Sequence, residues 1–197
     1  NMIEKTYAFD FDGIAVSTGI NAEIVKSNQE KVVITAPSDI MDMILVEKDG
    51  NTVKIRVKPN SNISTKRIKA MIYAKDFTSV MASSSADILI RDTFTQDRVS
   101  VQCSSSGDIS GNLEANEVSI MASSSGDFSG KIWAVLLNAS ASSSGDINIS
   151  GKATESNITC SSSGDFKGEK FFTKTANLVA SSSADIVINV EQNANAQ

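Results

Sequence analysis

The second half of the chain repeats the phrase Ser-Ser-Ser-(Gly/Ala)-Asp-(Ile/Phe) six times, and this repeat restricts the fold more than any other feature. Successive aspartates of the phrase are 21, 19, 19, 19 and 20 residues apart. A period of this length is typical of solenoids, in which one coil cannot bury its apolar face alone and must stack on its neighbours. At about 4.8 Å per coil, six coils predict a rod roughly 29 Å long.

Apolar residues recur at odd distances from each aspartate: seven and five positions before it, and one and three positions after it. Because alternate side chains of a strand point to opposite faces, these positions share one face, which we predict to be the core. The four columns are Val80, Val101, Ile120, Ala139, Ile158 and Leu178; Ala82, Cys103, Ala122, Ala141, Cys160 and Ala180; Ile88, Ile109, Phe128, Ile147, Phe166 and Ile186; and Ile90, Gly111, Gly130, Ile149, Gly168 and Ile188.

The repeated phrase itself predicts a tight corner between two sheets. Its middle serine and its Gly or Ala fall at inward positions, where only small side chains fit. Ala stands in the first and last copies, at Ala86 and Ala184, so crowding rather than a positive φ is the expected reason for Gly in the others. The structural corner residues are Ser84, Asp87, Ser105, Asp108, Ser124, Asp127, Ser143, Asp146, Ser162, Asp165, Ser182 and Asp185.

The chain divides into three segments on this basis. Residues 1–77 have the pattern of strands and hairpins that continue or cap the solenoid, with a tight hairpin expected at Asp49-Gly50-Asn51. Residues 78–190 form the repeat solenoid. Residues 191–197 are a polar tail that we expect to fray.

Composition excludes several classes of function. A net charge of -5 argues against a nucleic-acid surface, which needs clustered Lys and Arg, and no apolar run is long enough to span a membrane. The absence of histidine removes the commonest general base and metal ligand. Cys103 and Cys160 share one column three coils apart, or roughly 14 Å, too far for a disulfide, so both are expected to be free core residues.

A family resemblance follows from Gly19-Ile20-Asn21 within the stretch Phe11 to Asn21, succeeded by the Ser/Gly/Asp repeats. Together these features resemble the head GIN domain of putative bacterial autotransporter adhesins, across essentially the whole chain. The resemblance implies an all-β, right-handed two-sheet β-solenoid similar to pectin-lyase-like folds. It also implies an extracellular, cell-surface or periplasmic protein with a role in adhesion and no shared catalytic residues.

The aspartate row has two interpretations. It could bind calcium or carbohydrate, or each carboxylate could accept hydrogen bonds from backbone N–H groups and serine hydroxyls at its own corner. We favour the structural interpretation and expect those hydrogen bonds to lower the pKa values of the aspartates. Charges about 4.8 Å apart repel by roughly 0.9 kcal/mol in water, which an exposed row tolerates without a metal.

Other surfaces leave two alternatives open. Lys170 and Lys174, near Phe171 and Phe172, resemble part of a polysaccharide lyase or hydrolase site. A column of outward apolar residues, Met81, Met121 and Val179, could instead serve a bactofilin-like self-polymerising scaffold. Trp133 is expected to fold over the end of its coil.

The sequence therefore predicts a non-catalytic, adhesin-like β-solenoid. Six near-identical corners do not provide the differentiated roles of an active site. We expect no catalytic residue, no cofactor and no metal site. The expected partners are surface glycans, host matrix or further copies of the chain, and not nucleic acid.

Overall fold

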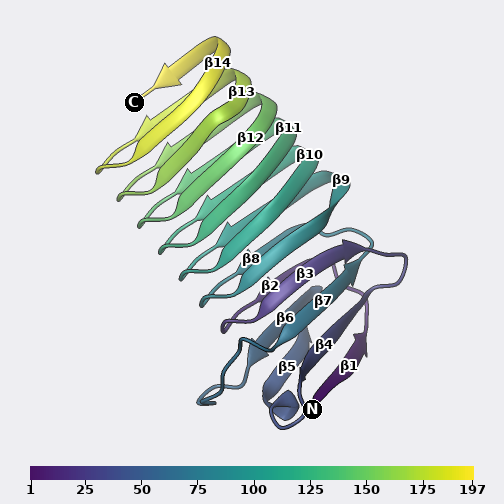
Figure 1. Cartoon of the computed structure of the whole chain (residues 1–197). Helices are drawn as coiled ribbons and strands as arrows, with labels where there is room; N and C mark the ends of the chain where they lie inside the picture. Colours follow the sequence, from purple (N-terminus) through teal and green to yellow (C-terminus); the bar gives the residue numbers. More distant parts are fainter.

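The computed structural model describes residues 1–197 and is built almost entirely of strands (Figure 1). One short 3-10 helix, η1, is the exception. The strands of the N-terminal part are β1 (Met2–Ala8), β2 (Gly13–Val16), β3 (Asn21–Lys26), β4 (Lys31–Pro37), β5 (Ile44–Asp49), β6 (Thr52–Val57), β7 (Lys69–Ala74) and β8 (Ser79–Ala82), and η1 is Met41–Met43.

The repeats form a β-solenoid, as predicted. Each long strand bends midway, so that its two halves form the two sides of a coil (Figure 1). Neighbouring strands pair in parallel, and each corner aspartate lies opposite the next, as Asp108 does with Asp127. The coils are β9 (Asp87–Cys103), β10 (Asp108–Ala122), β11 (Asp127–Ala141), β12 (Asp146–Cys160), β13 (Asp165–Ala180) and β14 (Asp185–Ala196).

The corner is a two-residue turn with a left-handed backbone. In the third copy, Ser124 and Ser125 have φ values of 47° and 63°, and the Gly126 N–H donates to the Ser123 carbonyl at 2.8 Å. Two successive positive φ values with this hydrogen bond define a type I′ turn. The other five copies have the same positive φ pair.

The predicted inward direction of the middle serines is wrong. The column of Ser84 and its equivalents is exposed, because the left-handed pair interrupts the alternation of a strand. The prediction for glycine is confirmed. A Cβ on Gly126 would lie 2.4 Å from the Cys103 carbonyl carbon, and Gly126 has no positive φ, so crowding by the preceding coil requires glycine.

The N-terminal strands lie in the same stack, out of sequence order. β2 pairs in parallel with both β6 and β8, and β3 pairs in parallel with both β7 and β9. β2 and β3 thus form a coil between the earliest repeat and the coil of β6 and β7. The antiparallel strands β4 and β5 then pair with β7 and β6, and β1 pairs with β4, which covers this end (Figure 1).

The Gly19-Ile20-Asn21 segment is the corner of that inserted coil. Thr18 and Gly19 have φ values of 56° and 68°, the same signs as a serine pair. The Gly19 N–H donates to the Ser84 carbonyl at 2.9 Å, just as the Ser85 N–H donates to the Ser105 carbonyl. Asn21 therefore pairs with Asp87 and occupies the aspartate position of a seventh corner.

One continuous core of 47 buried hydrophobic residues extends along the stack. The predicted inward apolar residues that precede Leu178 are all members of this core. At the C-terminal end, Leu178 of β13 and Ile186 and Ile188 of β14 are only partly buried, and Ala180 at the end of β13 is exposed, contrary to the prediction. The expected hairpin is present, with β5 and β6 antiparallel and Gly50 at φ 61°. The polar tail does not fray: β14 continues to Ala196, and residues 193–196 pair with residues 175–178 of β13.

Both cysteines are free and buried, as predicted. Cys103 and Cys160 belong to one column in which Ala122 and Ala141 separate them. Burial is the main cause that raises the pKa of Cys103 to about 12 and that of Cys160 to about 11. The reactive thiolate is therefore scarce in the folded protein.

We expect Gly126→Ala to lower the free energy of unfolding by about 1–3 kcal/mol, because the new methyl group meets backbone atoms that cannot move aside. The matched control is Ser125→Gly in the same turn. It removes a side chain at positive φ and should stabilise the protein by at most about 1 kcal/mol. Urea unfolding of the three proteins measures both changes, and equal stability of Gly126→Ala and the parent would contradict the crowding explanation.

We also expect neither cysteine to react with iodoacetamide at pH 8 in the native protein. A pKa of about 12 leaves roughly one thiolate in ten thousand at Cys103 at that pH. Mass spectrometry should show no added group before denaturation and two afterwards. Rapid native labelling of either residue would show that the core opens at that coil.

Candidate functional site

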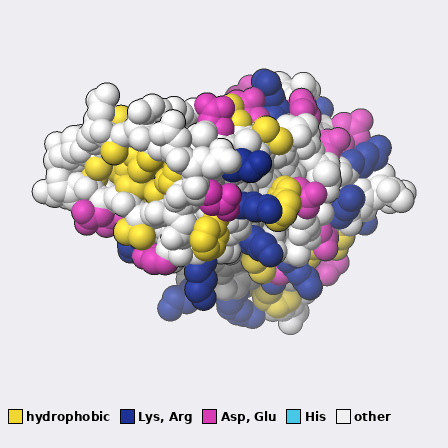
Figure 2. All heavy atoms as spheres, turned by 90° about the horizontal axis from the view of Figure 1, so that it is seen from above, with side chains coloured by type: hydrophobic (Ala, Val, Ile, Leu, Met, Phe, Trp, Pro, Cys, Tyr) yellow, Lys and Arg dark blue, Asp and Glu magenta, His cyan; other side chains and the backbone are white.

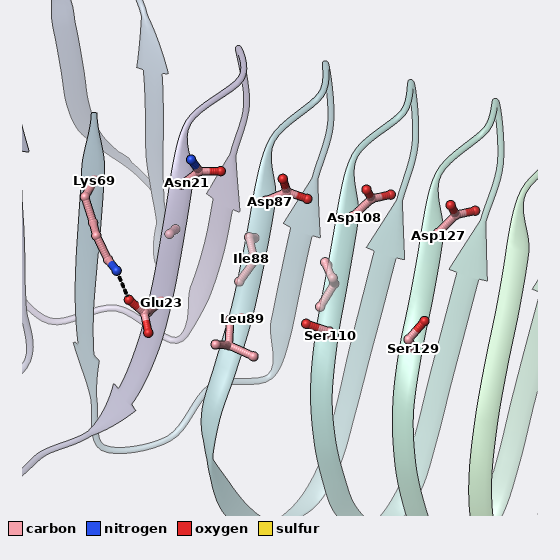
Figure 3. Close-up of a pocket in the computed structure, with 12 residues that line it drawn as sticks. Asn21, Glu23, Lys69, Asp87, Ile88, Leu89, Asp108, Ser110, Asp127 and Ser129 are labelled. Atoms are coloured by element: carbon pink, nitrogen blue, oxygen red, sulfur yellow. Dashed lines mark ion pairs between the residues drawn. The ribbon is translucent and has the colours of Figure 1, made fainter. Parts of the chain in front are cut away.

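The corner aspartates form one straight row on the outside of the solenoid. Each residue begins the strand that follows a tight turn, and parallel pairing in register places every copy directly beside the next. Figure 3 shows Asn21, Asp87, Asp108 and Asp127 side by side on four successive coils. The structure therefore brings together the predicted aspartates and adds Asn21 at the N-terminal end of the row.

A shallow groove of about 420 Å³ runs beside this part of the row. Leu89, Ser110 and Ser129 follow two positions after their aspartates and form its opposite side (Figure 3). At the N-terminal end of the groove, Glu23 pairs with the Lys69 ammonium. The groove offers aspartate carboxylates on three successive coils, the hydroxyls of Ser110 and Ser129, and the exposed apolar side chain of Leu89.

The electrostatics of the row differ from the prediction. The pKa values of Asp108 and Asp127 are raised above the usual range, not lowered. Partial burial is the main cause at both residues, and repulsion from neighbouring aspartates is the next. Backbone N–H groups of the following coil lower both values but do not offset these effects. The parallel backbone hydrogen bonds between coils therefore hold the aspartates in a row although their carboxylates repel one another.

The charges are partly compensated further along the row. The Lys167 ammonium lies 3.6 Å from an Asp146 carboxylate oxygen. The Asp185 N–H donates to a carboxylate oxygen of Asp165 at 3.1 Å; this donor lies on the next coil and not at the aspartate's own corner, where the sequence analysis expected the donors. No group of three or more Asp, Glu or Cys side chains is gathered closely enough to hold a metal ion.

A second surface breaks the repeat. We define the aromatic patch as Trp133, Val135, Lys152, Phe172 and Lys174. Trp133, Lys152 and Phe172 occupy the same position on three successive coils, and Val135 and Lys174 follow two positions after Trp133 and Phe172. With Glu191 and neighbouring atoms, the patch lines a shallow depression of about 250 Å³.

The expectation that Trp133 folds over the end of its coil is wrong. The residue is 51% exposed, and the Lys152 ammonium lies 4.6 Å from its ring centre in a cation-π contact. Phe172 is 45% and Val135 55% exposed. Exposed apolar groups of this size in one place are typical of a surface that binds a partner.

The predicted lysine and phenylalanine cluster is divided by the structure. Phe171 is fully buried and packs against Phe166, whereas Phe172 points to solvent. Lys174 lies at the aromatic patch, but Lys170 lines a separate polar depression. The alternation of a strand causes this division, because adjacent residues face opposite ways.

A third surface, formed by the strand segments that lead into each corner, carries a feature that the sequence analysis did not predict. The predicted outward residues Met81, Met121 and Val179 are exposed there. Beside them, four asparagine amides form a ladder of three hydrogen bonds, in which the Nδ2 of each later residue donates to the Oδ1 of the asparagine on the preceding coil at 2.9–3.1 Å. The sequence did contain a signal for this ladder, because asparagine stands eight positions before three successive corner aspartates. The ladder consists of Asn138, Asn157, Asn177 and Asn195.

These features define a class of protein: a β-solenoid with long, shallow, repetitive faces and one exposed aromatic patch. Residues 10–133 and 120–197 match the family described as "Putative auto-transporter adhesin, head GIN domain", and the chain belongs to this family. No curated protein sequence matches the chain.

Several solved structures have a similar fold. A putative adhesin from Parabacteroides distasonis has a TM-score of 0.79 at 15% identity, and the match covers 100% of this chain and 97% of that chain. A putative adhesin from Parabacteroides merdae has a TM-score of 0.80 at 13% identity, with 100% and 96% covered. A putative lipid binding protein from P. distasonis has a TM-score of 0.81 at 18% identity, with 100% and 94% covered. At these identities the likeness shows the fold alone.

The family places the protein among adhesin-like proteins of the cell surface or extracellular space. No helix in the structure has the length and apolar character needed to cross a membrane.

We expect Asp127→Asn to raise the melting temperature by roughly 1–3 °C at pH 7. A carboxyl whose pKa is raised by folding destabilises the fold while it is charged. This penalty is present at neutral pH and disappears as the pH falls through the folded and then the ordinary pKa, so the gain should vanish near pH 3. Thermal unfolding followed by circular dichroism across this range measures the effect.

The control for this prediction is Asp39→Asn, which removes the same charge from an exposed position outside the row. It should change the melting temperature less than Asp127→Asn does at pH 7. A lower melting temperature of Asp127→Asn at pH 7 would show that the hydrogen bonds accepted by this carboxylate outweigh repulsion.

Proposed function

We propose that the protein is a non-catalytic surface adhesin that binds glycans through the aromatic patch and the adjoining faces of a rigid rod. The observation that carries this proposal is the exposure of Trp133 and Phe172 on either side of Lys152. Aromatic rings can cover the apolar faces of sugar rings, and lysine ammonium groups favour acidic sugars. The family supports the adhesion role and an extracellular, cell-surface or periplasmic location.

The spacing of the patch suits an extended polymer. Trp133 and Phe172 are two coils apart, roughly 9.6 Å, on a stack that cannot easily change this distance. A chain of sugar units could contact both rings at once. Several such shallow contacts, or several copies of the protein on one cell, would sum their affinities by avidity.

The corner groove gives little support to an enzyme. A hydrolase or lyase needs groups with different roles held around one reacting bond. The groove instead repeats carboxylates and serines from coil to coil, so its groups have equal and not differentiated roles. Proteins, lipids and other copies of the chain remain alternative partners that the experiment below separates from glycans.

We expect the parent protein to bind acidic polysaccharides such as alginate or hyaluronate more tightly than neutral dextran. Replacing Trp133 and Phe172 together by Ala should weaken this binding about tenfold or more, because two stacking contacts are lost. Biolayer interferometry on immobilised polysaccharide measures the affinities. Met121→Ala, which removes an exposed apolar side chain beside the asparagine ladder and outside the aromatic patch, is the matched control and should bind like the parent.

The same samples test catalysis. Absorbance of unsaturated uronates reports lyase activity, and new reducing ends report hydrolysis. Turnover that is lost in Lys174→Ala would overturn the non-catalytic proposal. Equal polysaccharide binding by the parent and the double variant would overturn the role of the aromatic patch.

A further inference from the structure

The two ends of the solenoid are closed to different degrees. At the N-terminal end, β4 and β5 pair antiparallel with the coil of β6 and β7 and bury it, so that Val53, Ile55 and Ile72 have no exposed surface. The outermost strands there also carry charge, with Glu4 and Lys5 in β1. Charged side chains on an edge strand oppose further strand pairing.

The C-terminal end has no such cover. Ile186 is only partly buried, whereas its five equivalents in the preceding coils are at most 2% exposed. Ala180 is exposed, although all five of its equivalents are fully buried. In Figure 2, hydrophobic side chains gather in one patch on this end, at the left of the view, with uncharged groups around them. We define the open end as Leu178, Ala180, Ala184, Ile186 and Ile188 with the free edge of β14.

The open end is chemically suited to pair with a β-strand of a partner. β14 pairs only with β13, so its outer edge presents backbone N–H and C=O groups without partners from another strand. The asparagine ladder also terminates here at Asn195, whose amide oxygen accepts no bond from a further coil. A lipid or sugar would cover the apolar groups but would not supply a matching row of backbone donors and acceptors.

Charge and shape favour an identical partner. From residue 175 onward the chain has no Lys or Arg and only two acidic residues, Asp185 and Glu191, so two copies meet with little like-charge repulsion. A second open end also has the same two-sided outline as the first. Head-to-tail growth is unfavourable because the other end is covered and charged.

We propose that the open end docks against the open end of a second copy, with the β14 strands antiparallel across a two-fold axis. Such an interface is isologous and closes on itself, so it produces a dimer and not a filament. A strand half of about six residues spans roughly 20 Å, and the two sides of a coil lie about 10 Å apart. With side chains, this outline covers several hundred Å² per copy, at the low end for a stable complex. The dimer doubles the number of aromatic patches on one rigid rod.

The first test is the mass of the 197-residue chain measured by light scattering over a dilution series. We expect twice the mass of one chain at high concentration and dissociation on dilution. Ile186→Lys should weaken dimerisation at least tenfold, because it places a charge in the centre of the interface. Val187→Lys is the matched control: the adjacent side chain is exposed on the side of the rod, and this variant should dimerise like the parent.

Ala180→Lys guards against misfolding of the first variant, because this residue is already exposed and its replacement fills no buried space. A parent protein that stays monomeric throughout the series would overturn the proposal. A dimer that survives both Ile186→Lys and Ala180→Lys would also overturn it. These readouts do not involve sugars, so failure here is distinguishable from failure of the proposed glycan binding.

The orientation of the dimer is tested with spin labels. Because Cys103 and Cys160 are buried, a cysteine introduced at an exposed site is the one that reacts. Label pairs at Val187→Cys should give a short distance between chains, whereas labels at Thr6→Cys in β1 should lie at opposite ends of the assembly. A short distance between the Thr6→Cys labels would show that the covered ends meet and would overturn the proposed interface.

Discussion

Parallel backbone hydrogen bonding in register between successive coils is the interaction on which the rest of the structure depends. It places each residue beside its equivalent 19 to 21 residues away, so every position of the repeat becomes a column. The type I′ turn makes this stacking regular, because a left-handed residue pair reverses the chain in the least space and its own N–H bonds to the next corner. The two serines of each turn adopt positive φ values, and the residue after them is in most copies a glycine, because a Cβ there would clash with the preceding coil.

Stacking the same residue type on successive coils has different consequences for different side chains. Apolar columns stabilise the stack, since each coil removes the apolar surface of its neighbour from water. A column of asparagines also stabilises the stack, because each amide carries both a donor and an acceptor and can extend a hydrogen-bonded ladder. A row of aspartates is destabilising, because partial burial and then repulsion between identical neighbouring charges raise the pKa values of Asp108 and Asp127.

Regularity also explains where function can reside. A row of equal corners provides the same shallow chemistry repeatedly, which suits many weak contacts with a long partner. The aromatic patch departs from the repeat because Trp133 and Phe172 interrupt a column that is otherwise polar on the adjoining coils, with Glu114 before them and Asn189 after them. The open end departs from it for another reason: the apolar residues of β14 repeat those of the inner coils, but they are only partly buried in the structure.

The sequence by itself determined the solenoid, its inward columns and the separation of Cys103 from Cys160, because a fixed period and the alternation of a strand are local properties. Only the tertiary structure decided the rest. The insertion of the Gly19-Ile20-Asn21 coil between β6 and β8 depends on pairing between distant segments. The left-handed serines depend on the closure of a turn that propensity alone does not favour. The aspartate pKa values and the exposure of Trp133 depend on which groups of the neighbouring coils lie beside each side chain. The sequence pattern gives neither the distances to those groups nor the burial of the side chain.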